Sequence, residues 1–395
     1  MTKWSHHFVI FLAALPVAAQ ETGLRVVSDF PGGSAKVESI DAATRTIRVL
    51  PATHPDRGWV CWWSFKVEGL APGEAVTLDV GGGVWATPDR AAVSFDGKTW
   101  KQTGAGTREK ARIRYRVEAP GKEAWFAWGP PFVLKDAREA VERAARACPR
   151  AKPFELCTSR DGHSVPAVRF APPAGEAKLG LWVQARQHAW ESGGSWVGRG
   201  FLDWLASDDP RAAALRARAE VVVVLVMDSD NVERGAGGKE QKPQDHNRDW
   251  SERPHWPEVR AAQEGIRKMA EAGRFHVFVD LHNPGAGSKE PYFYVAPKEL
   301  LSERGRRNLD AFLTAAKAEI VGPLRFTGKT EESGAGYDKN WERISKNWVS
   351  RAAPDAVAVT LETAWNTPHS TAEGYARVGR ELGLAIERYL RESNY

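Results

Sequence analysis

Residues 178–194 read KLGLWVQARQHAWESGG, an apolar run that ends in a short segment with a histidine, a glutamate and two glycines. Such a run is typical of a strand that is buried on both faces of a sheet. Three later runs have the same character, at 220–227 (EVVVVLVM), 276–281 (HVFVDL) and 357–361 (VAVTL). Helical patterns occur between and after these runs at about 196–206, 257–272, 299–319 and 371–392. The alternation predicts an α/β fold over residues 166–395, with a mixed, mostly parallel central sheet flanked by helices.

The part of the chain before this region has a different pattern. From Arg25 to about Phe132, short β-branched and aromatic runs alternate with turns rich in glycine, proline and aspartate. This pattern predicts an antiparallel β-sandwich of about a hundred residues. A helical pattern follows at 135–147. We therefore predict a sandwich domain at 20–133, a connecting helix and linker at 134–165, and the α/β domain at 166–395.

Composition limits the class of protein. The chain has 395 residues, of which 42% are hydrophobic and 10% aromatic, and this excludes a disordered chain. Its 55 basic and 50 acidic residues are interspersed, so we expect no nucleic-acid partner. Three scattered cysteines, Cys61, Cys148 and Cys157, form neither a disulfide framework nor a metal cluster.

The N-terminus has the pattern of an export signal. Phe8–Ala18 is an apolar run that is too short to span a bilayer. Small residues at Val17-Ala18-Ala19 then offer a cleavage site for a signal peptidase. We predict a signal peptide at residues 1–19 and an exported protein, periplasmic or secreted, with no membrane partner after the signal is removed.

Polar side chains follow each predicted strand of the α/β domain. His188 and Glu191 follow the first strand, and a glycine-rich loop that ends in Asn247-Arg248 follows the second. His282 ends the third strand and Glu362 ends the fourth. The carboxyl ends of strands form the crevice where ligands bind in α/β sheets, so we expect these side chains to converge.

The residue types in this set are those of a catalytic zinc site. His188, Glu191 and His282 would fill three tetrahedral positions and leave the fourth to water. Glu362 would take a proton from that water, and the forked guanidinium of Arg248 suits a carboxylate. Each piece alone has an ordinary structural explanation, and the prediction rests on their combination. We expect the neighbouring His246 to be a solvated loop residue.

The motifs also resemble a known family. Gln187-His188 with Glu191-Ser192, the loop from Asp228 to Arg248, Asp280-Leu281-His282 and Thr360-Leu361-Glu362 resemble the zinc carboxypeptidases of the funnelin type. The resemblance is strongest to the cytosolic-carboxypeptidase-like branch, in which the catalytic domain follows a β-sandwich. It implies one zinc ion per chain on His188, Glu191 and His282, with Glu362 as the general base. Asn247 and Arg248 would hold the terminal carboxylate of the substrate.

The sequence departs from the family pattern at three places. Family members carry an arginine about nine residues before the Asn-Arg pair, where it stabilises the developing oxyanion. Gly238 occupies this position, which leaves Arg234 and Lys239 as candidates. Tyr337 is the candidate for the tyrosine that the family carries on a mobile loop. Ala189-Trp190 stands where the branch has a proline.

The sequence therefore predicts a zinc metallocarboxypeptidase that hydrolyses the C-terminal peptide bond of peptides or proteins. One alternative is a zinc amidase or deacylase that acts on acylated amino acids or cell-wall peptides, and another is a non-catalytic binding protein that retains the fold. Arg343 and Lys346 either select acidic C-terminal residues or belong to a solvated face. We expect Trp59, Trp62 and Trp63 to pack in the core rather than to bind a sugar.

Overall fold

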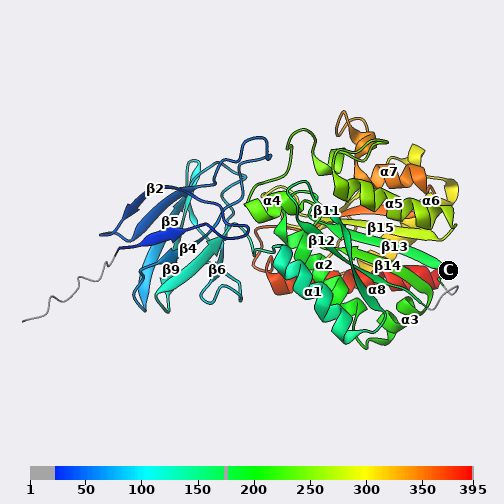
Figure 1. The fold of residues 1–395 in the computed structure, drawn as a ribbon, viewed down its shortest axis with the longest axis horizontal. Helices are drawn as coiled ribbons and strands as arrows, with labels where there is room; N and C mark the ends of the chain where they lie inside the picture. The colour runs from blue at the N-terminus through cyan, green and yellow to red at the C-terminus, as the bar shows by residue number, and fades with distance from the viewer. Residues whose placement is uncertain (1–22, 173–176, 394–395) are drawn as a thin grey trace, which may run out of the picture.

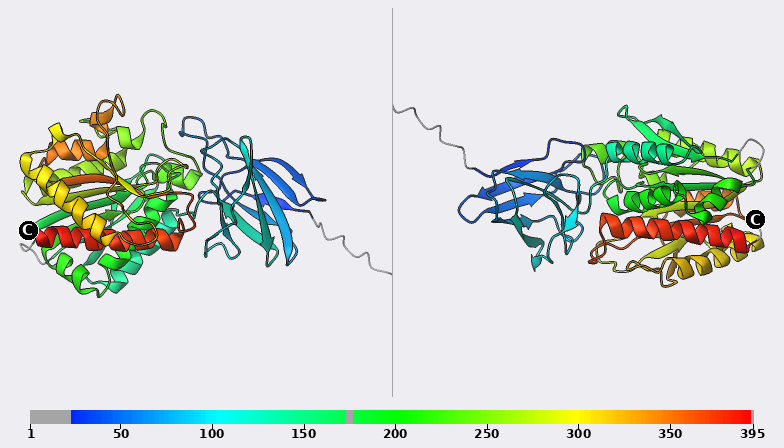
Figure 2. Two further views of the ribbon diagram at one scale, coloured as in Figure 1. Left: turned by 180° about the vertical axis from the view of Figure 1, so that it is seen from behind. Right: turned by 90° about the horizontal axis from the view of Figure 1, so that it is seen from below.

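The computed structural model describes residues 23–172 and 177–393, which form a β-rich part and an α/β part joined end to end (Figure 1). The predicted signal peptide lies outside the described residues. Among the helices of the described ranges, none is long and apolar enough to cross a membrane. Figure 2 shows that the β-rich part contacts one end of the α/β part, and that the C-terminus lies at the opposite end.

The β-rich part is the predicted sandwich. One sheet has the order β1 (Arg25–Val27), β4 (Ser64–Glu68), β10 (Glu123–Ala127), β6 (Ala92–Ser94) and β7 (Lys101–Gln102). The other has the order β2 (Lys36–Asp41), β3 (Thr46–Leu50), β5 (Glu74–Val80), β9 (Arg112–Ala119) and β8 (Thr107–Glu109). Strand β9 alternates buried residues such as Tyr115 with more exposed arginines, as a strand with one face on a core must. The sequence predicts an antiparallel sandwich. The pairing of β3 with β5 is parallel, so the sandwich departs from this prediction at one pair of strands.

The α/β part contains one sheet of eight strands. Their order is β11 (Ala151–Thr158), β12 (Ser164–Phe170), β14 (Ala219–Val224), β13 (Leu179–Ala185), β15 (Phe275–His282), β18 (Val357–Glu362), β16 (Tyr292–Val295) and β17 (Thr330–Glu332). The four central strands, β14, β13, β15 and β18, are parallel. The mixed, mostly parallel sheet is therefore as predicted, and its central strands are the four apolar runs of the sequence.

Helices cover both faces of this sheet because its central strands are apolar on both sides. One face packs against α1 (Leu134–Ala147), α2 (Ser192–Leu205), α3 (Pro210–Arg218), α6 (Glu303–Glu319) and α8 (Ala372–Glu392). The other packs against α5 (Pro257–Glu271) and α7 (Ser345–Ala352). The remaining helical segments are α4 (Ser229–Arg234) and three short turns of 3-10 helix at His246–Arg248, Lys298–Leu300 and Trp341–Arg343.

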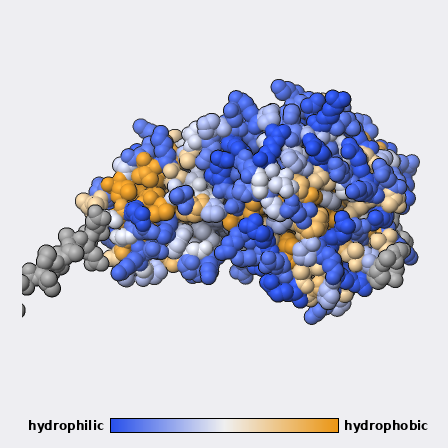
Figure 3. All heavy atoms as spheres, viewed as in Figure 1, coloured by the Kyte–Doolittle hydropathy of each residue, from blue (hydrophilic) through white to orange (hydrophobic). Residues whose placement is uncertain are grey.

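The structure alters one predicted boundary. Residues 134–165, predicted as a connecting helix and linker, contain the edge strand β11 and the start of β12 besides helix α1. Both strands pair antiparallel at the edge of the eight-stranded sheet, so this segment is built into the α/β part. Most of the face that Figure 3 shows is hydrophilic, and an apolar patch lies on the sandwich over β2, which exposes Val37 and Ile40.

Candidate metal centre and active site

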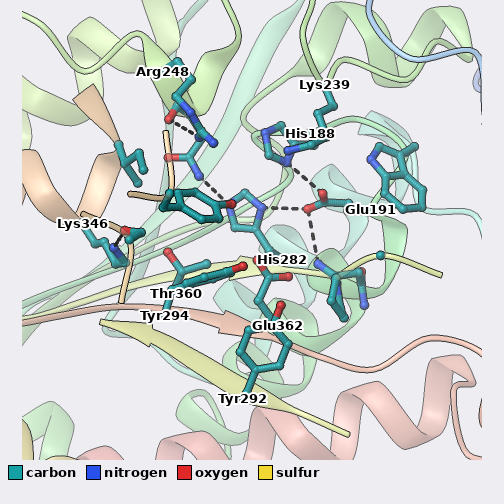
Figure 4. A pocket seen from close by; sticks show the side chains of 18 of the residues that line it. His188, Glu191, Lys239, Arg248, His282, Tyr292, Tyr294, Lys346, Thr360 and Glu362 are labelled. Carbon is teal, nitrogen blue, oxygen red and sulfur yellow. Dashed lines mark hydrogen bonds and ion pairs between the residues drawn. The ribbon is translucent and has the colours of Figure 1, made fainter. Parts of the chain in front are cut away.

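The structure brings the three predicted metal ligands together. His188 and Glu191 lie in the turn between β13 and α2, and His282 is the last residue of β15. One ligand atom from each residue lies within 4.8 Å of the others. His188 Nδ1 is 2.8 Å from Glu191 Oε1, and His282 Nδ1 is 2.7 Å from Glu191 Oε2 (Figure 4). All three side chains are buried, and they line one cavity.

The backbone geometry of the turn explains why the two segments can approach each other. A Cβ atom on Gly194 would lie 2.6 Å from the carbonyl oxygen of Leu281, so only glycine permits this contact between α2 and β15. Arg186, just before the turn, adopts a left-handed conformation with a φ of 64°. Its buried guanidinium donates to the carbonyl oxygens of Ala189 and Phe132 and so holds the turn from inside.

Each histidine of the cluster has a carboxylate at its other ring nitrogen. His188 Nε2 is 3.2 Å from Asp245 Oδ1, and His282 Nε2 is 3.1 Å from Asp280 Oδ2. Such partners fix the tautomer and the ring orientation of a metal-ligating histidine. Burial raises the pKa of Glu191, but His188 and His282 outweigh it, and the pKa is lowered. Two Nδ1 atoms and a charged carboxylate form the donor set of a zinc site, so the residues fit the metal.

Glu362 ends β18 directly beside His282 in the parallel pairing. Its Oε2 atom is buried and has no hydrogen-bond partner among the described residues. Burial raises the pKa of this carboxyl to about 7; His282 acts in the opposite direction and Glu191 in the same direction. A carboxyl group with a free oxygen and a pKa near neutrality can both accept and return a proton.

Arg248 and Asn247 line the same cavity as the cluster, and this cavity has a volume of about 140 Å³. Arg248 Nε donates to Asp338 Oδ2 at 2.9 Å, and its guanidinium carbon lies 5.7 Å from the centre of the Tyr337 ring. Asn247 uses its amide within the protein, because its Oδ1 accepts from the backbone of Ser345 at 3.0 Å. Its Nδ2 lies 3.5 Å from His282 Nε2.

The two candidate cations for the oxyanion lie in different places. Lys239 lines the cavity, and its ammonium lies 5.3 Å from the centre of the Trp59 ring. Arg234 instead pairs with Asp161 at 2.8 Å and does not line the cavity. The geometry therefore places Lys239, and not Arg234, in the cavity of the candidate metal ligands. Tyr337 also lines the cavity, with 45% of its surface exposed and its ring 5.1 Å from that of Tyr294.

Sequence reasoning left Lys346 open, and the structure places it in the cavity wall. Its side chain is fully buried and donates to Ser333 Oγ and to Asn347 Oδ1. Burial and the nearby charge of Arg248 lower the pKa of Lys346 to about 7. Arg343 does not line this cavity.

Several further residues of the site carried no recognisable signal in the sequence. Tyr292 and Tyr294 reach the cavity from β16, with Tyr292 opposite Glu362 in the antiparallel pairing. Trp59 and Trp85 reach it from the sandwich. Trp59 is half-buried and packs against the hydrophobic core, as expected, but it also lines the cavity, whereas Trp62 and Trp63 are buried as predicted.

The expectation that His246 is a solvated loop residue is wrong. It is 1% exposed and stacks on Trp256 with ring centres 4.6 Å apart. Its ring nitrogens lie 3.7 Å from Asp228 and 3.8 Å from Glu258. Two buried acidic neighbours, which no local pattern reveals, explain why an imidazole is held inside the protein at this position.

Comparison with known proteins supports the same assignment of the fold. The crystal structure of a metallo-carboxypeptidase from Burkholderia cenocepacia matches with a TM-score of 0.78 and 22% identity, covering 94% of this chain and 100% of that one. A metallo-carboxypeptidase from Pseudomonas aeruginosa, in complex with (2-guanidinoethylmercapto)succinic acid, gives the same TM-score, identity and coverage. No model of a known protein family matches the chain.

The relatives found by sequence match smaller parts of the chain. An uncharacterized protein of Zymomonas mobilis is 26% identical over 236 residues, which are 58% of this chain and 60% of that protein. Cytosolic carboxypeptidase 2 of Danio rerio is 26% identical over 210 residues, which are 47% of this chain and 29% of that protein. The chain thus spans less than two thirds of each of these relatives. The chain therefore has the fold of the bacterial metallo-carboxypeptidases, and about half of its sequence is similar to part of a cytosolic carboxypeptidase.

Proposed function

We propose that the chain is an exported zinc metallocarboxypeptidase that removes the C-terminal residue from peptides or proteins. One observation carries the proposal: the buried cluster of His188, Glu191 and His282 opens into the same cavity as the unpartnered carboxyl oxygen of Glu362 and the guanidinium of Arg248. A metal cluster, a base and a carboxylate anchor in one cavity are the groups that a carboxypeptidase needs.

The residues take these roles in the proposed reaction. When bound, zinc polarises a carbonyl group and lowers the pKa of water. Glu362 takes a proton from the attacking water and passes it to the leaving amine. Arg248, oriented by Asp338, grips the terminal carboxylate through two parallel hydrogen bonds. Lys239 and Tyr337 lie where they can stabilise the oxygen of the scissile carbonyl as it gains charge.

The cavity wall also supports a preference for an acidic terminal side chain. Lys346 places a buried ammonium beside Ser333, and no carboxylate forms an ion pair with it among the described residues. A buried charge without a partner is costly, and a substrate carboxylate would compensate it. We therefore propose glutamate or aspartate as the preferred C-terminal residue.

Mass spectrometry of a mixed peptide pool tests this function. The wild-type protein, loaded with zinc, is incubated beside the Glu362→Gln variant, and the zinc content of both is measured. We expect single-residue losses from C-termini, mostly of acidic residues, with the wild type and none with the variant. Zinc binding without any such loss would favour an amidase or deacylase. Failure of the wild type to bind zinc would favour a non-catalytic binding protein.

A further inference from the structure

Two tryptophans of the sandwich form part of the wall of the cavity that the candidate metal ligands line. The ring centres of Trp59 and Trp85 lie 4.8 Å apart, and both residues line the cavity with the metal ligands. Trp85 is 41% exposed, which is a large exposure for an indole. A Cβ atom on Gly285 would lie 2.7 Å from its ring, so the ring rests directly on the backbone that follows His282. We call these two side chains the tryptophan wall.

The tryptophan wall lies on the far side of the cluster from the substrate anchors. In Figure 4, Arg248 and Lys346 lie on one side of His282, whereas Lys239 and Glu191 lie on the other. Trp59 belongs to the second side, because its ring lies under the ammonium of Lys239 and 6.4 Å from the ring of Trp190. A peptide that is held at Arg248 and cleaved at the cluster must continue toward this side. The residue before the scissile bond therefore meets the tryptophan wall.

Hydrogen bonds hold the tryptophan wall in place, to the α/β part near Trp59 and within the sandwich at Trp85. The amide of Trp59 donates to the carbonyl oxygen of Lys239 at 2.9 Å, and the amide of Gly238 donates to that of Arg57 at 2.9 Å. The indole of Trp128 donates to the carbonyl oxygen of Trp85 at 2.7 Å. The aromatic surface is thus held in place before a ligand arrives, which reduces the entropy that binding must overcome.

We infer that Trp59 and Trp85 form a subsite for the side chain that precedes the scissile bond, and that this subsite favours an aromatic side chain. The inference rests on the proposed carboxypeptidase function and assigns the sandwich a direct part in substrate selection. Lys239 covers one face of Trp59, so the exposed ring of Trp85 is the main apolar surface that a substrate can reach. Aromatic side chains pack on such a ring edge to face or offset.

Two N-blocked dipeptides that differ only in their first residue, Phe or Gly, test the subsite. Their terminal residue is the one that the wild type removes fastest from the peptide pool. We expect the wild-type kcat/KM to favour the Phe peptide by about tenfold, which corresponds to about 1.4 kcal/mol. Trp85→Ala should reduce this ratio to about 2, because the Phe peptide loses much more of its kcat/KM than the Gly peptide does. Trp85→Phe should retain most of the preference.

Trp100→Ala is the matched control, because Trp100 is a half-buried sandwich tryptophan that lines a different cavity. This variant should keep the wild-type ratio. Equal cleavage of both peptides by the wild type, or an equal loss on both in Trp85→Ala, would overturn the subsite and leave the carboxypeptidase function intact. If the zinc-loaded wild type removes no residue from any peptide, the proposed function fails and the subsite fails with it.

Discussion

The charge of Lys346 gives the cavity a pH-dependent preference. Because burial and Arg248 lower its pKa to about 7, the side chain is an ammonium below pH 7 and a neutral amine above it. We expect the ratio of kcat/KM for a Glu-terminated peptide to that for its Gln-terminated analogue to fall about tenfold between pH 6 and pH 8. Titration of Glu362 affects both peptides equally and cancels in the ratio.

Lys346→Met is the variant that isolates this effect. It should lower the ratio at pH 6 by about tenfold or more, because a charge-assisted hydrogen bond is lost, and it should make the ratio independent of pH. The measurement is kcat/KM for the two peptides from pH 6 to pH 8. A ratio that does not vary with pH in the wild type, or that survives in Lys346→Met, would contradict the assignment of Lys346 to the side-chain pocket.

A second prediction at the scale of a single residue concerns the substitution of Arg248. Arg248→Ala should lower kcat/KM for peptides with a free C-terminus by about a hundredfold, because a bidentate, charge-assisted contact is removed. C-terminally amidated peptides, which lack the carboxylate, should be cleaved almost as they are by the wild type. Arg248→Lys should recover only part of the loss, since an ammonium cannot reproduce the planar fork. An equal loss on free and amidated peptides would rule out the role as an anchor.

At the scale of elements, helices α2 and α8 pack with their backbones in contact. A Cβ atom on Gly379 would lie 1.9 Å from the carbonyl oxygen of Val197, and one on Gly200 would lie 1.9 Å from that of Ala376. Gly379→Ala should therefore lower the free energy of unfolding by about 1–3 kcal/mol, although alanine is the better helix former. Urea denaturation measures the change.

Arg380→Ala is the control for this helix, since the Arg380 side chain is 59% exposed on the next position of α8. It should change the free energy of unfolding by no more than about 0.5 kcal/mol. A Gly379→Ala protein as stable as the wild type would mean that the two helices can separate without loss, and that the close contact is not needed.

The elements also explain which parts of the site the sequence could predict. His188, Glu191, His282 and Glu362 follow apolar strands, and the carboxyl ends of parallel strands meet at one edge of a sheet. Lys346 could not be assigned, because α7 is an eight-residue helix with mostly polar letters, SKNWVSRA, although six of its residues are buried. Such burial arises from tertiary packing, which local periodicity does not record.

At the scale of the whole molecule, a continuous path joins the metal cluster to the sandwich. Asp245 holds the ring of His188 and also accepts from the amide of Glu240 at 2.9 Å. The adjacent Lys239 is tied by its backbone to Trp59. A second link is the cluster of Trp128, Trp190 and Trp365, whose ring centres lie 4.5 to 5.8 Å apart. The sequence predicted the fold class of the chain but not this shared site, because the contacts join segments far apart in the chain.

Removal of the proposed zinc ion should therefore lower the thermal stability of both parts of the molecule. The ligands come from the β13–α2 turn and from β15, and without the metal a buried carboxylate and two imidazoles must satisfy one another. A ligand present at about 1,000 times its Kd stabilises the folded state by about 4 kcal/mol. We expect a chelator to lower the Tm by several degrees, in a single transition that includes the sandwich because the two parts share buried aromatic residues. Differential scanning calorimetry with and without the chelator measures both properties. His188→Ala, which lacks one of the ligands, should show a lowered Tm that the chelator hardly changes. If the wild type binds zinc but its Tm is the same with and without the chelator, the metal does not stabilise the fold.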